Sequence, residues 1–363
     1  MKYYIIAGEV SGDLHGSYLM QSIKEKDPSA RFRYWGGDKM LEQDPNIVKH
    51  ISKLAFMGLV EVLKNLRTIL KNIAFCKRDI SDFNPDVLVL IDYPGFNLKI
   101  AQYAKKKGYK VAYYIAPQVW AWKESRVKQI KKFVDRLMVI LPFEKDFFMR
   151  HGVNASFVGH PLSVVVNDYN YQDDFHTANN LDPAKPIIAL LPGSRSQEIQ
   201  QVLPDMIKVS DAFPNFQFVI AGVHPHKFSD YPVSAIPIIF NQTYDVLKNA
   251  DAAIVTSGTA TLETALHKIP QVVVYKGSWL LYIVAKSILK IRYISLVNLI
   301  ADAPVVEELI QKDCTPHNIE LALRNILQQP SGILNSYSQV VDKLGQKNAP
   351  DLAANIILDL SKS

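Results

Sequence analysis

Several features that mark whole classes of proteins are scarce or missing in this chain of 363 residues. It has only two cysteines, Cys76 and Cys314, whose spacing fits neither a disulfide framework nor a metal-binding motif. The apolar run at the N-terminus is too short for a signal peptide, and the longest apolar stretch, residues 278–300, is interrupted by lysines and an arginine. These absences argue against a disulfide-rich secreted protein and against a membrane span, and they favour a reducing, cytoplasmic setting.

Two common nucleotide-binding signatures are also absent. No glycine-rich turn is followed by Gly-Lys-Ser/Thr, so the chain has no Walker A loop, and no G-x-G-x-x-G dinucleotide fingerprint occurs. The sequence therefore argues against ATP hydrolysis and against a nicotinamide-dependent oxidoreductase. No cluster of metal ligands is evident either, so we expect neither a metal ion nor an organic cofactor.

The charge that is present is unevenly placed. The net charge of +6 divides into +10 over residues 1–165 and −4 over residues 166–363. A basic half is typical of a protein that meets an anionic partner, such as a nucleic acid, a membrane surface or a charged substrate. Such a surface can also serve solubility alone, so the charge by itself does not decide among these.

Apolar runs alternate with helical patterns along the chain in two series. The expected strands are residues 2–7, 87–91, 110–115, 136–140 and 156–158 in the first series, and 187–191, 217–221, 252–255 and 271–275 in the second. Uniformly apolar strands that alternate with helices indicate parallel sheets covered on both faces. The polar stretch 166–186 separates the two series. The sequence therefore predicts an α/β protein with two Rossmann-like, doubly wound domains that face a cleft.

We place the first domain at residues 1–165 and the second at 166–345. The remaining segment, 346–363, is expected to be a C-terminal helix that packs back on the first domain or on a partner subunit. In doubly wound sheets, ligands bind outside the carboxyl ends of the strands, so motifs that directly follow strands are the candidates for function.

One such motif in the second domain is the Pro-Gly turn after residues 187–191. Gly193 lets the backbone approach a ligand closely, Ser194 can cap the following helix, and Arg195 adds a rigid positive fork suited to phosphate oxygens. Backbone N–H groups at a helix start favour an anion. An ordinary strand-to-helix turn with a surface arginine is the alternative.

A second turn of the same kind follows residues 252–255. Ser257, Gly258 and Thr259 offer backbone and hydroxyl donors to a diphosphate, and Glu263 lies one helical turn further on. A carboxylate there could accept hydrogen bonds from both ribose hydroxyls, although it could also be an exposed helix carboxylate. Two such turns with a ribose-type glutamate together favour a nucleoside diphosphate ligand.

Candidate catalytic side chains follow strands of the first domain. Asp92 ends a buried strand and could act as a general base if desolvation raised its pKa above about 3.9, the ordinary value for a free aspartate. Capping of the next turn is the alternative role for Asp92. Asn97 could orient a substrate hydroxyl or do the same capping work. Trp120 and Trp122 could stack on a sugar or line an apolar wall.

The first turn of the chain, AGEVSGDLHG at residues 7–16, has three glycines but is acidic, which disfavours phosphate. We expect Glu9, Ser11 and Asp13 to hydrogen-bond sugar hydroxyls or to order the site around Asp92. The alternative is that Ser11 and Asp13 simply begin a helix.

Residues 54–75 combine a wide apolar stripe with neighbouring cations. The stripe includes Val60, Leu63, Leu66 and Leu70. This pattern fits binding at a membrane interface, and it also fits an amphipathic helix that faces the protein core.

Taken together, these motifs resemble the lipid A disaccharide synthase family, which are inverting glycosyltransferases of the two-Rossmann-domain GT-B type. The matching stretches keep their order over nearly the whole chain: AGEVSGDLHG, FMGLVEVL, PDVLVLIDYPGFN, YYIAPQVWAWKESRV, LPFEKDFF, FVGHP, LLPGSRSQEI, SGTATLE, YISLVNLIA and VVEELIQ. One departure is visible, because the family commonly reads Ser-Leu-Pro-Asn-Leu where this chain has Val297 in place of the proline.

The resemblance implies that 2,3-diacylglucosamine passes from UDP-2,3-diacylglucosamine to the 6-hydroxyl of 2,3-diacylglucosamine 1-phosphate (lipid X). The products would be the β(1→6)-linked lipid A disaccharide 1-phosphate and UDP. It further implies that Asp92 is the base, that Arg195 stabilises the departing UDP, and that Asn298 lies at a polar position near the donor.

The resemblance also favours the membrane role of residues 54–75, because both substrates carry acyl chains. It implies a cytoplasmic protein bound peripherally to the anionic inner face of the inner membrane of a Gram-negative cell. A homodimer involving the C-terminal part is expected, and no nucleic-acid partner. The alternatives are another UDP-sugar enzyme of the same fold, such as a UDP-N-acetylglucosamine 2-epimerase, and a non-catalytic nucleotide-sugar-binding module.

Overall fold

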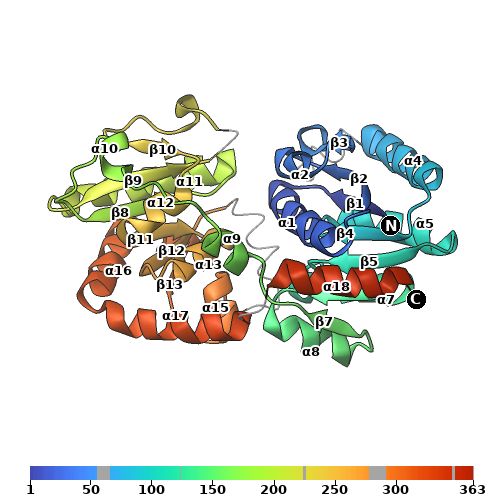
Figure 1. Cartoon of the computed structure of the whole chain (residues 1–363). Helices are drawn as coiled ribbons and strands as arrows, with labels where there is room; N and C mark the ends of the chain where they lie inside the picture. Colours follow the sequence, from blue (N-terminus) through green and yellow to red (C-terminus); the bar gives the residue numbers. More distant parts are fainter. Residues whose placement is uncertain (55–65, 123, 224–225, 278–291, 346–347, 363) are drawn as a thin grey trace. The chain divides into compact units, whose positions relative to one another are not determined.

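Figure 1 shows the computed structural model, which describes residues 1–54, 66–122, 124–223, 226–277, 292–345 and 348–362. The chain forms two compact α/β units. The first comprises Met1–Pro161 together with Gly345–Ser363, and the second comprises Leu162–Leu344. The boundary between the units thus falls before Leu162 rather than after residue 165, and the C-terminal segment belongs to the first unit.

The first unit contains a parallel sheet in the order β3-β2-β1-β4-β5-β6-β7. Its strands are β1 (Lys2–Ala7), β2 (Arg31–Gly36), β3 (Ile47–His50), β4 (Val87–Ile91), β5 (Lys110–Tyr114), β6 (Arg136–Val139) and β7 (Ala155–Phe157). Five of these follow the predicted runs to within a residue or so at each end. The sequence analysis missed β2 and β3, because β2 carries two arginines and β3 is short and only half-buried.

Helices cover both faces of this first sheet. They are α1 (Val10–Lys26), α2 (Asp38–Gln43), α4 (Leu66–Phe83), α5 (Pro94–Lys106), α6 (Val119–Trp122), α7 (Val127–Phe133), α8 (Pro142–Arg150) and α18 (Ala349–Lys362). Tyr3 and Ile5 of β1 pack in the cluster that contains residues of α1 and α18, whereas Tyr4 and Ile6 pack in the cluster that contains residues of α4, α5 and α7. Successive strand residues point to opposite faces, so both faces must be apolar.

The second unit repeats this plan with strand order β10-β9-β8-β11-β12-β13. Its strands are β8 (Ile187–Leu191), β9 (Gln217–Gly222), β10 (Ile238–Phe240), β11 (Ala250–Thr256), β12 (Gln271–Tyr275) and β13 (Glu307–Ile310). Its helices are α9 (Leu162–Asn167), α10 (Phe175–Ala178), α11 (Ser196–Val209), α12 (Thr243–Lys248), α13 (Thr259–Leu266), α15 (Leu296–Ala301), α16 (Pro316–Gln328) and α17 (Pro330–Leu344). The prediction of two doubly wound α/β domains is confirmed.

Strand order determines where ligands can bind on each unit. The sheet order reverses around β1, which lies between β2 and β4, and around β8, which lies between β9 and β11. Ligands of open parallel sheets bind beyond the carboxyl ends of strands at such switch points. In the described part of the chain, none of the helices has the length and apolar content that a transmembrane span requires.

Candidate functional site

The carboxyl edge of the first sheet carries unusual backbone conformations. Asp92 and Tyr93 follow β4 with φ angles of 42° and 48°, and Ile115 follows β5 with a φ of 61°. A left-handed conformation in a residue other than glycine costs of order 1–3 kcal/mol, and such residues cluster at active sites. The strain at the ends of two neighbouring strands therefore marks this edge as a candidate site.

The carboxyl of Asp92 is largely removed from water at this edge. Burial, the larger cause, and the negative charge of Glu9 together raise the pKa of Asp92 to about 7, although a hydrogen bond from the backbone N–H of Tyr93 acts to lower it. A group with a pKa near the working pH is suited to proton transfer. The desolvation that the sequence analysis required of a base at this position is therefore present.

Two side chains hold the main chain of Asp92 in its strained position. The Asn97 Nδ2 atom donates to the carbonyl oxygens of Asp92 at 2.8 Å and Ile91 at 3.2 Å, and the hydroxyl of Tyr113 donates to the Asp92 carbonyl at 2.6 Å. Asn97 is fully buried, so its amide supports the backbone rather than projecting into solvent. A direct contact from Asn97 to a substrate hydroxyl stays a prediction.

The acidic first turn divides into structural and accessible residues. Both carboxylate oxygens of Asp13 accept backbone hydrogen bonds from the start of α2, from the N–H groups of Gly37 at 2.6 Å, Lys39 at 3.0 Å and Met40 at 3.1 Å. Asp13 is thus a buried cap for a neighbouring helix, which differs from either role expected of it. Glu9 is half-buried and Ser11 is exposed, so these two remain accessible to a ligand.

The glycine at the start of this turn makes room for an aromatic ring. A Cβ atom at Gly8 would lie 2.3 Å from the ring of Tyr93, a separation that no real side chain adopts. Gly8 therefore allows β1 and the strained end of β4 to approach closely, which is a packing role rather than a ligand contact.

Trp120 is linked to a buried carboxyl that the sequence analysis did not select. The indole Nε1 of Trp120 donates to the Glu144 Oε1 atom at 3.0 Å, and Glu144 is 1% exposed. The available signal was the position of Glu144 three residues after the helix cap Leu141, the spacing of a capping box. The side chain of Trp122 lies outside the described residues.

In the second unit, the turn after β8 is built around a glycine that cannot be replaced without strain. Gly193 has a φ of 98°, and a Cβ atom there would lie 2.4 Å from the Glu198 Oε2 atom. Arg195 begins α11, and its Nη1 atom lies 2.6 Å from the Glu198 Oε1 atom. The arginine side chain is 61% exposed, so Glu198 holds it while leaving it accessible to an anion.

A histidine also supports this turn. The Nε2 atom of His226 lies 2.9 Å from the carbonyl oxygen of Ser194, and its other ring nitrogen lies 3.6 Å from Asp230. Because a carbonyl oxygen can only accept, the Nε2–H group of His226 is the donor in the bond to Ser194. His226 follows β9, far from the turn in sequence, so the local pattern around residues 193–195 could not reveal it.

The turn after β11 is open above its glycine. Among the described residues, nothing lies within 4 Å of the position that a Gly258 Cβ atom would take. The Ser257 hydroxyl donates to the Ile294 carbonyl at 2.8 Å, which leaves the exposed Thr259 and the first N–H groups of α13 as donors for a ligand. Among the described residues, the space on the Cβ side of Gly258 is therefore open.

Glu263 is held by an aromatic cluster. The hydroxyl of Tyr244 donates to the Glu263 Oε1 atom at 2.8 Å, and burial raises the pKa of Glu263. Tyr244 packs edge-on against Tyr169 with ring centroids 5.0 Å apart, and against His267 at 5.1 Å. Tyr244 thus engages one carboxylate oxygen of Glu263, and a ribose contact from this residue stays a prediction.

Asn298 is buried and fully engaged within the protein. Its Nδ2 atom donates to the Val306 carbonyl and to the Glu308 Oε1 atom, each at 2.9 Å, and its Oδ1 atom accepts from the Val306 N–H at 2.9 Å. Glu308 also accepts from the N–H groups of Ile294 and Ser295. Asn298 and Glu308 therefore hold the loop that the Ser257 hydroxyl binds, and a direct donor contact from Asn298 stays a prediction.

A half-buried carboxyl on a strained backbone in one unit, and two glycine turns at helix starts in the other, agree with the comparison to known families. The family model described as lipid-A-disaccharide synthetase matches residues 3–355. This chain belongs to that family. The GT-B glycosyltransferase identity that the ordered motifs indicated is thereby confirmed.

Full-length relatives support the lipid-A-disaccharide synthetase assignment. The chain is 38% identical over 366 residues to the lipid-A-disaccharide synthase of Coxiella burnetii, covering 98% of this chain and 97% of that protein. It is 38% identical over 373 residues to the lipid-A-disaccharide synthase of Geobacter metallireducens, covering 98% and 96%.

Solved structures support the fold at much lower identity. A glycotransferase of kitacinnamycin is similar with a TM-score of 0.68 at 14% identity, covering 99% of this chain and 98% of that one. The UDP-GlcNAc 2-epimerase of Methanocaldococcus jannaschii, solved with UDP-GlcNAc and UDP, has a TM-score of 0.67 at 13% identity, covering 99% and 100%. Such distant likeness establishes the GT-B fold and does not favour the epimerase alternative.

The predicted membrane helix of this synthetase is described only in part. Val60 and Leu63 lie outside the described residues. Leu66 and Leu70 on α4 are 47% and 52% exposed, whereas Ile73 is buried in the core. The core-facing alternative therefore accounts for one face of α4 but not for its exposed leucines.

Among the described residues, no group of three or more His, Cys, Asp or Glu side chains is arranged to hold a metal ion. Cys76 and Cys314 are both buried free thiols. Neither cysteine contributes to the candidate site, in keeping with their sequence spacing.

Proposed function

We propose that this chain carries out the reaction of its family on the substrates that the motifs implied. It transfers 2,3-diacylglucosamine from UDP-2,3-diacylglucosamine to the 6-hydroxyl of 2,3-diacylglucosamine 1-phosphate. The observation that carries the proposal is the carboxyl of Asp92, which stands on a strained backbone and has a pKa raised to about 7, chiefly by burial, on a chain that matches the synthetase family from residue 3 to 355.

Asp92 is the proposed general base. Its carboxylate takes the proton of the acceptor 6-hydroxyl while that oxygen attacks the anomeric carbon of the donor. The bond from the anomeric carbon to the UDP oxygen breaks, and UDP leaves with the electron pair. Attack from the face opposite UDP inverts the anomeric centre and gives the β(1→6) linkage. Tyr113 and Asn97 support the step by fixing the Asp92 backbone.

The two turns of the second unit are the proposed site of the UDP group. The exposed Arg195 and the N-termini of α11 and α13 place positive charge and N–H donors where negative charge develops on the leaving diphosphate. Glu263, through the oxygen that Tyr244 leaves unused, would bind the ribose. These contacts are made by the protein alone and require no step through a metal ion.

The exposed face of α4 is the proposed membrane contact. Leu66, Leu70 and Phe75 expose 47%, 52% and 40% of their surface, with the exposed Arg67 and Lys71 between them. This combination fits a helix that lies on an anionic lipid surface.

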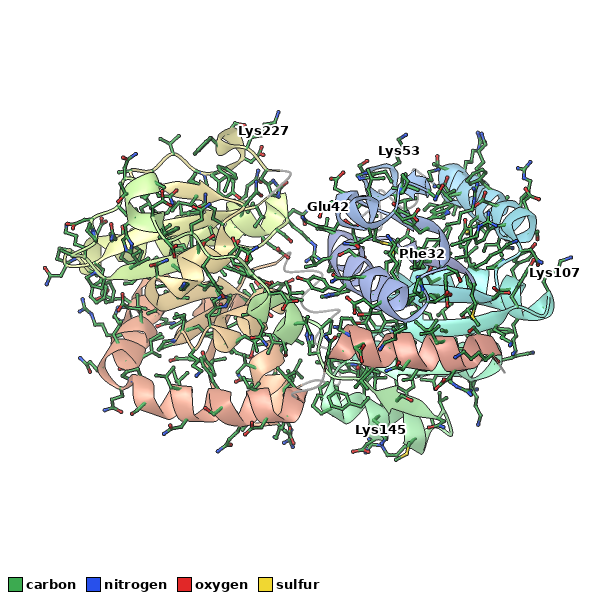
Figure 2. The ribbon with its side chains drawn as sticks, in the orientation of Figure 1. Phe32, Glu42, Lys53, Lys107, Lys145 and Lys227 are labelled. Atoms are coloured by element: carbon green, nitrogen blue, oxygen red, sulfur yellow. The ribbon has the colours of Figure 1, made fainter. Side chains whose placement is uncertain are left out.

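A groove beside this helix is also lined by apolar and basic side chains. It has a volume of about 450 Å³ and is lined by Ile47, Val48, Lys49, His50, Lys53 and Phe75. Figure 2 labels Lys53, Lys107 and Lys145, which point outward from different sides of the first unit. Part of the excess positive charge is thus spread around the unit, and part flanks the groove. Peripheral binding to the inner face of the inner membrane follows as part of the proposal.

The proposal is tested by incubating the purified protein with the UDP-diacylglucosamine donor and lipid X in detergent micelles. Formation of the disaccharide 1-phosphate and an equal amount of UDP is expected, with and without a chelator. Release of UDP without disaccharide, or conversion of UDP-N-acetylglucosamine to its 2-epimer, would contradict it. A homodimer is also expected, and size-exclusion chromatography with light scattering tests that separately.

A further inference from the structure

A second buried carboxyl at the edge of the first sheet has no role in the mechanism above. Glu144 lies in the first turn of α8, which follows β6, and Asp92 follows β4. Strand β5 lies between β4 and β6 in the sheet, and Trp120 belongs to α6, which follows β5. Asp92, Trp120 and Glu144 thus come after three neighbouring parallel strands, so their backbones meet at one edge.

Both oxygens of the Glu144 carboxyl accept hydrogen bonds. The Oε2 atom accepts from the N–H groups of Leu141 at 3.0 Å and Ile140 at 3.2 Å, which is the usual work of a helix cap. The Oε1 atom accepts from the Trp120 indole at 3.0 Å. Helix capping explains the two bonds to Oε2 only. The bond from Trp120 to Oε1 therefore serves another purpose.

Keeping a carboxyl at this depth is costly. Glu144 is 1% exposed, and burial raises its pKa to about 7 despite the three hydrogen bonds that favour its charged form. A neutral or apolar side chain would avoid that cost. The negative charge of Asp92 also raises the pKa of Glu144.

The indole of Trp120 is held from two directions. Its N–H is bound to Glu144, and its ring packs edge-on against Phe143 with centroids 4.9 Å apart and planes at 90°. Trp120 is nevertheless only half-buried, so part of the ring remains accessible. Rotation of the indole would break the bond to a carboxyl that has no water to replace it.

We propose that Glu144 is a positioning residue that fixes the Trp120 indole as a platform for the acceptor glucosamine ring beside Asp92. The inference rests on the proposed function and adds to it. The apolar face of the sugar packs on the fixed indole, which holds the 6-hydroxyl in reach of the base. Glu144 itself contacts no substrate and takes no proton in the reaction.

The groups around Glu144 match the hydrogen-bonding chemistry of a carboxylate. An ionised carboxylate only accepts hydrogen bonds, and all three groups that face Glu144 are N–H donors. Glutamine has one acceptor oxygen and one NH₂ group, so it can satisfy either the helix cap or Trp120. Glu144→Gln therefore disturbs this arrangement with almost no change in shape.

The test measures initial rates for the wild-type chain, Glu144→Gln, Trp120→Phe and the double variant. Each single change is expected to raise the KM for the acceptor about tenfold, as the loss of a hydrogen bond to a charged group allows, with a smaller change in kcat. The double variant should be no worse than the poorer single variant, because both remove the same bond. Affinity for UDP should stay unchanged, since its proposed contacts belong to the other unit.

Asp146→Asn is the matched control. Asp146 is exposed on the same helix, so this change removes one negative charge without touching Trp120, and wild-type kinetics are expected. Melting temperatures of all variants separate a loss of positioning from a loss of folding.

The inference is overturned if the two single effects multiply in the double variant, or if Trp120→Phe leaves the acceptor KM unchanged. The second criterion holds even if Glu144→Gln fails to fold. A wild-type chain that forms no disaccharide overturns the proposed function itself, and this inference with it, before any variant is measured.

Discussion

The carboxyl edges of the two sheets differ in the sign and the exposure of their charged side chains. At the first sheet, Asp92 and Glu144 are carboxyls whose burial raises each pKa to about 7, and the backbone of Asp92 is strained. At the second sheet, Arg195 is 61% exposed and the space above Gly258 is open. The first edge reduces the exposure of carboxyl groups to water, whereas the second presents an exposed guanidinium and an open stretch of backbone.

This difference agrees with a division of labour between the units. Proton transfer benefits from a desolvated group with a matched pKa, and binding of a diphosphate benefits from accessible N–H groups and a guanidinium. Under the proposed function, the same βα architecture supports two chemistries, because the residues after the strands differ while the sheets do not.

Asp92→Asn is the change expected to have the largest effect. It removes the proposed base but keeps the size of the side chain, so turnover should fall about a thousandfold while UDP affinity is retained. Rate assays combined with calorimetric titration of UDP measure both. Turnover within tenfold of wild type would remove Asp92 from the role of base and abolish the contrast between the two edges.

The same variant also tests the burial of Asp92. The pKa of Asp92 is raised from 3.8 to about 7 in the folded protein. This carboxyl therefore lowers the stability of the folded protein as the pH rises from about 4 to 7. Asp92→Asn should therefore melt at a higher temperature than wild type at pH 8, with the difference vanishing below pH 4. Equal melting temperatures at pH 8 would mean that Asp92 is not desolvated.

Arg195→Ala should have the next largest effect, on the other edge. Loss of the proposed charge-assisted contact to the diphosphate should weaken UDP binding about tenfold and lower kcat/KM by at least as much. Calorimetric titration of UDP gives the first quantity and initial rates give the second. Glu198→Gln is a useful companion variant, because it frees the guanidinium and should not weaken UDP binding. A larger loss of UDP affinity in Glu198→Gln than in Arg195→Ala would contradict the proposed role of Arg195.

Leu66→Ser combined with Leu70→Ser tests a third surface of the first unit. Both side chains are about half exposed, so folding should stay intact while recovery in the membrane fraction falls several-fold. Cell fractionation followed by quantitative immunoblotting measures it. Ile73→Ser, a buried position of the same helix, is the control that should instead destabilise the protein. Unfolding of the double leucine variant would show that this face belongs to the core.

Glu9→Gln should produce the smallest effect. The negative charge of Glu9 raises the pKa of Asp92, with burial the larger cause. Activity should decline below about pH 7 as Asp92 becomes protonated, and removing the charge of Glu9 should move that midpoint downward by less than about one unit. The pH profile of kcat/KM measures the shift. An upward shift would contradict the proximity of the two carboxyls.

Much of the fold was predictable because it depends on local patterns. The runs at residues 2–7, 87–91, 187–191 and 271–275 coincide with β1, β4, β8 and β12 to the residue. Apart from Lys2 and Gln271 at their first positions, these strands consist of apolar and aromatic residues, as strands covered on both faces must. The edge strands β3 and β10 were missed, because a short strand with partial burial leaves a weak apolar signal.

The sequence by itself also determined which side chains directly follow strands. A glycine or proline turn after an apolar run identifies the end of a strand, and therefore the residues that follow it. This is why Asp92, Gly193, Arg195 and Ser257 could be selected, and why their order along the chain indicated the family. The strand-turn-helix pattern is local, and local patterns survive in a single sequence.

Only the tertiary structure decided what those side chains do to one another. Asp13 caps α2 rather than its own helix, and Glu144 accepts a hydrogen bond from Trp120. Asn298 hydrogen-bonds to Val306 and Glu308, and α18 packs against the first sheet. The pKa of Asp92 likewise depends on burial and on Glu9, which lies far away in sequence. Hydrogen-bond partners and desolvation are set by residues that folding brings close from distant parts of the chain, so no pattern around a single motif can specify them.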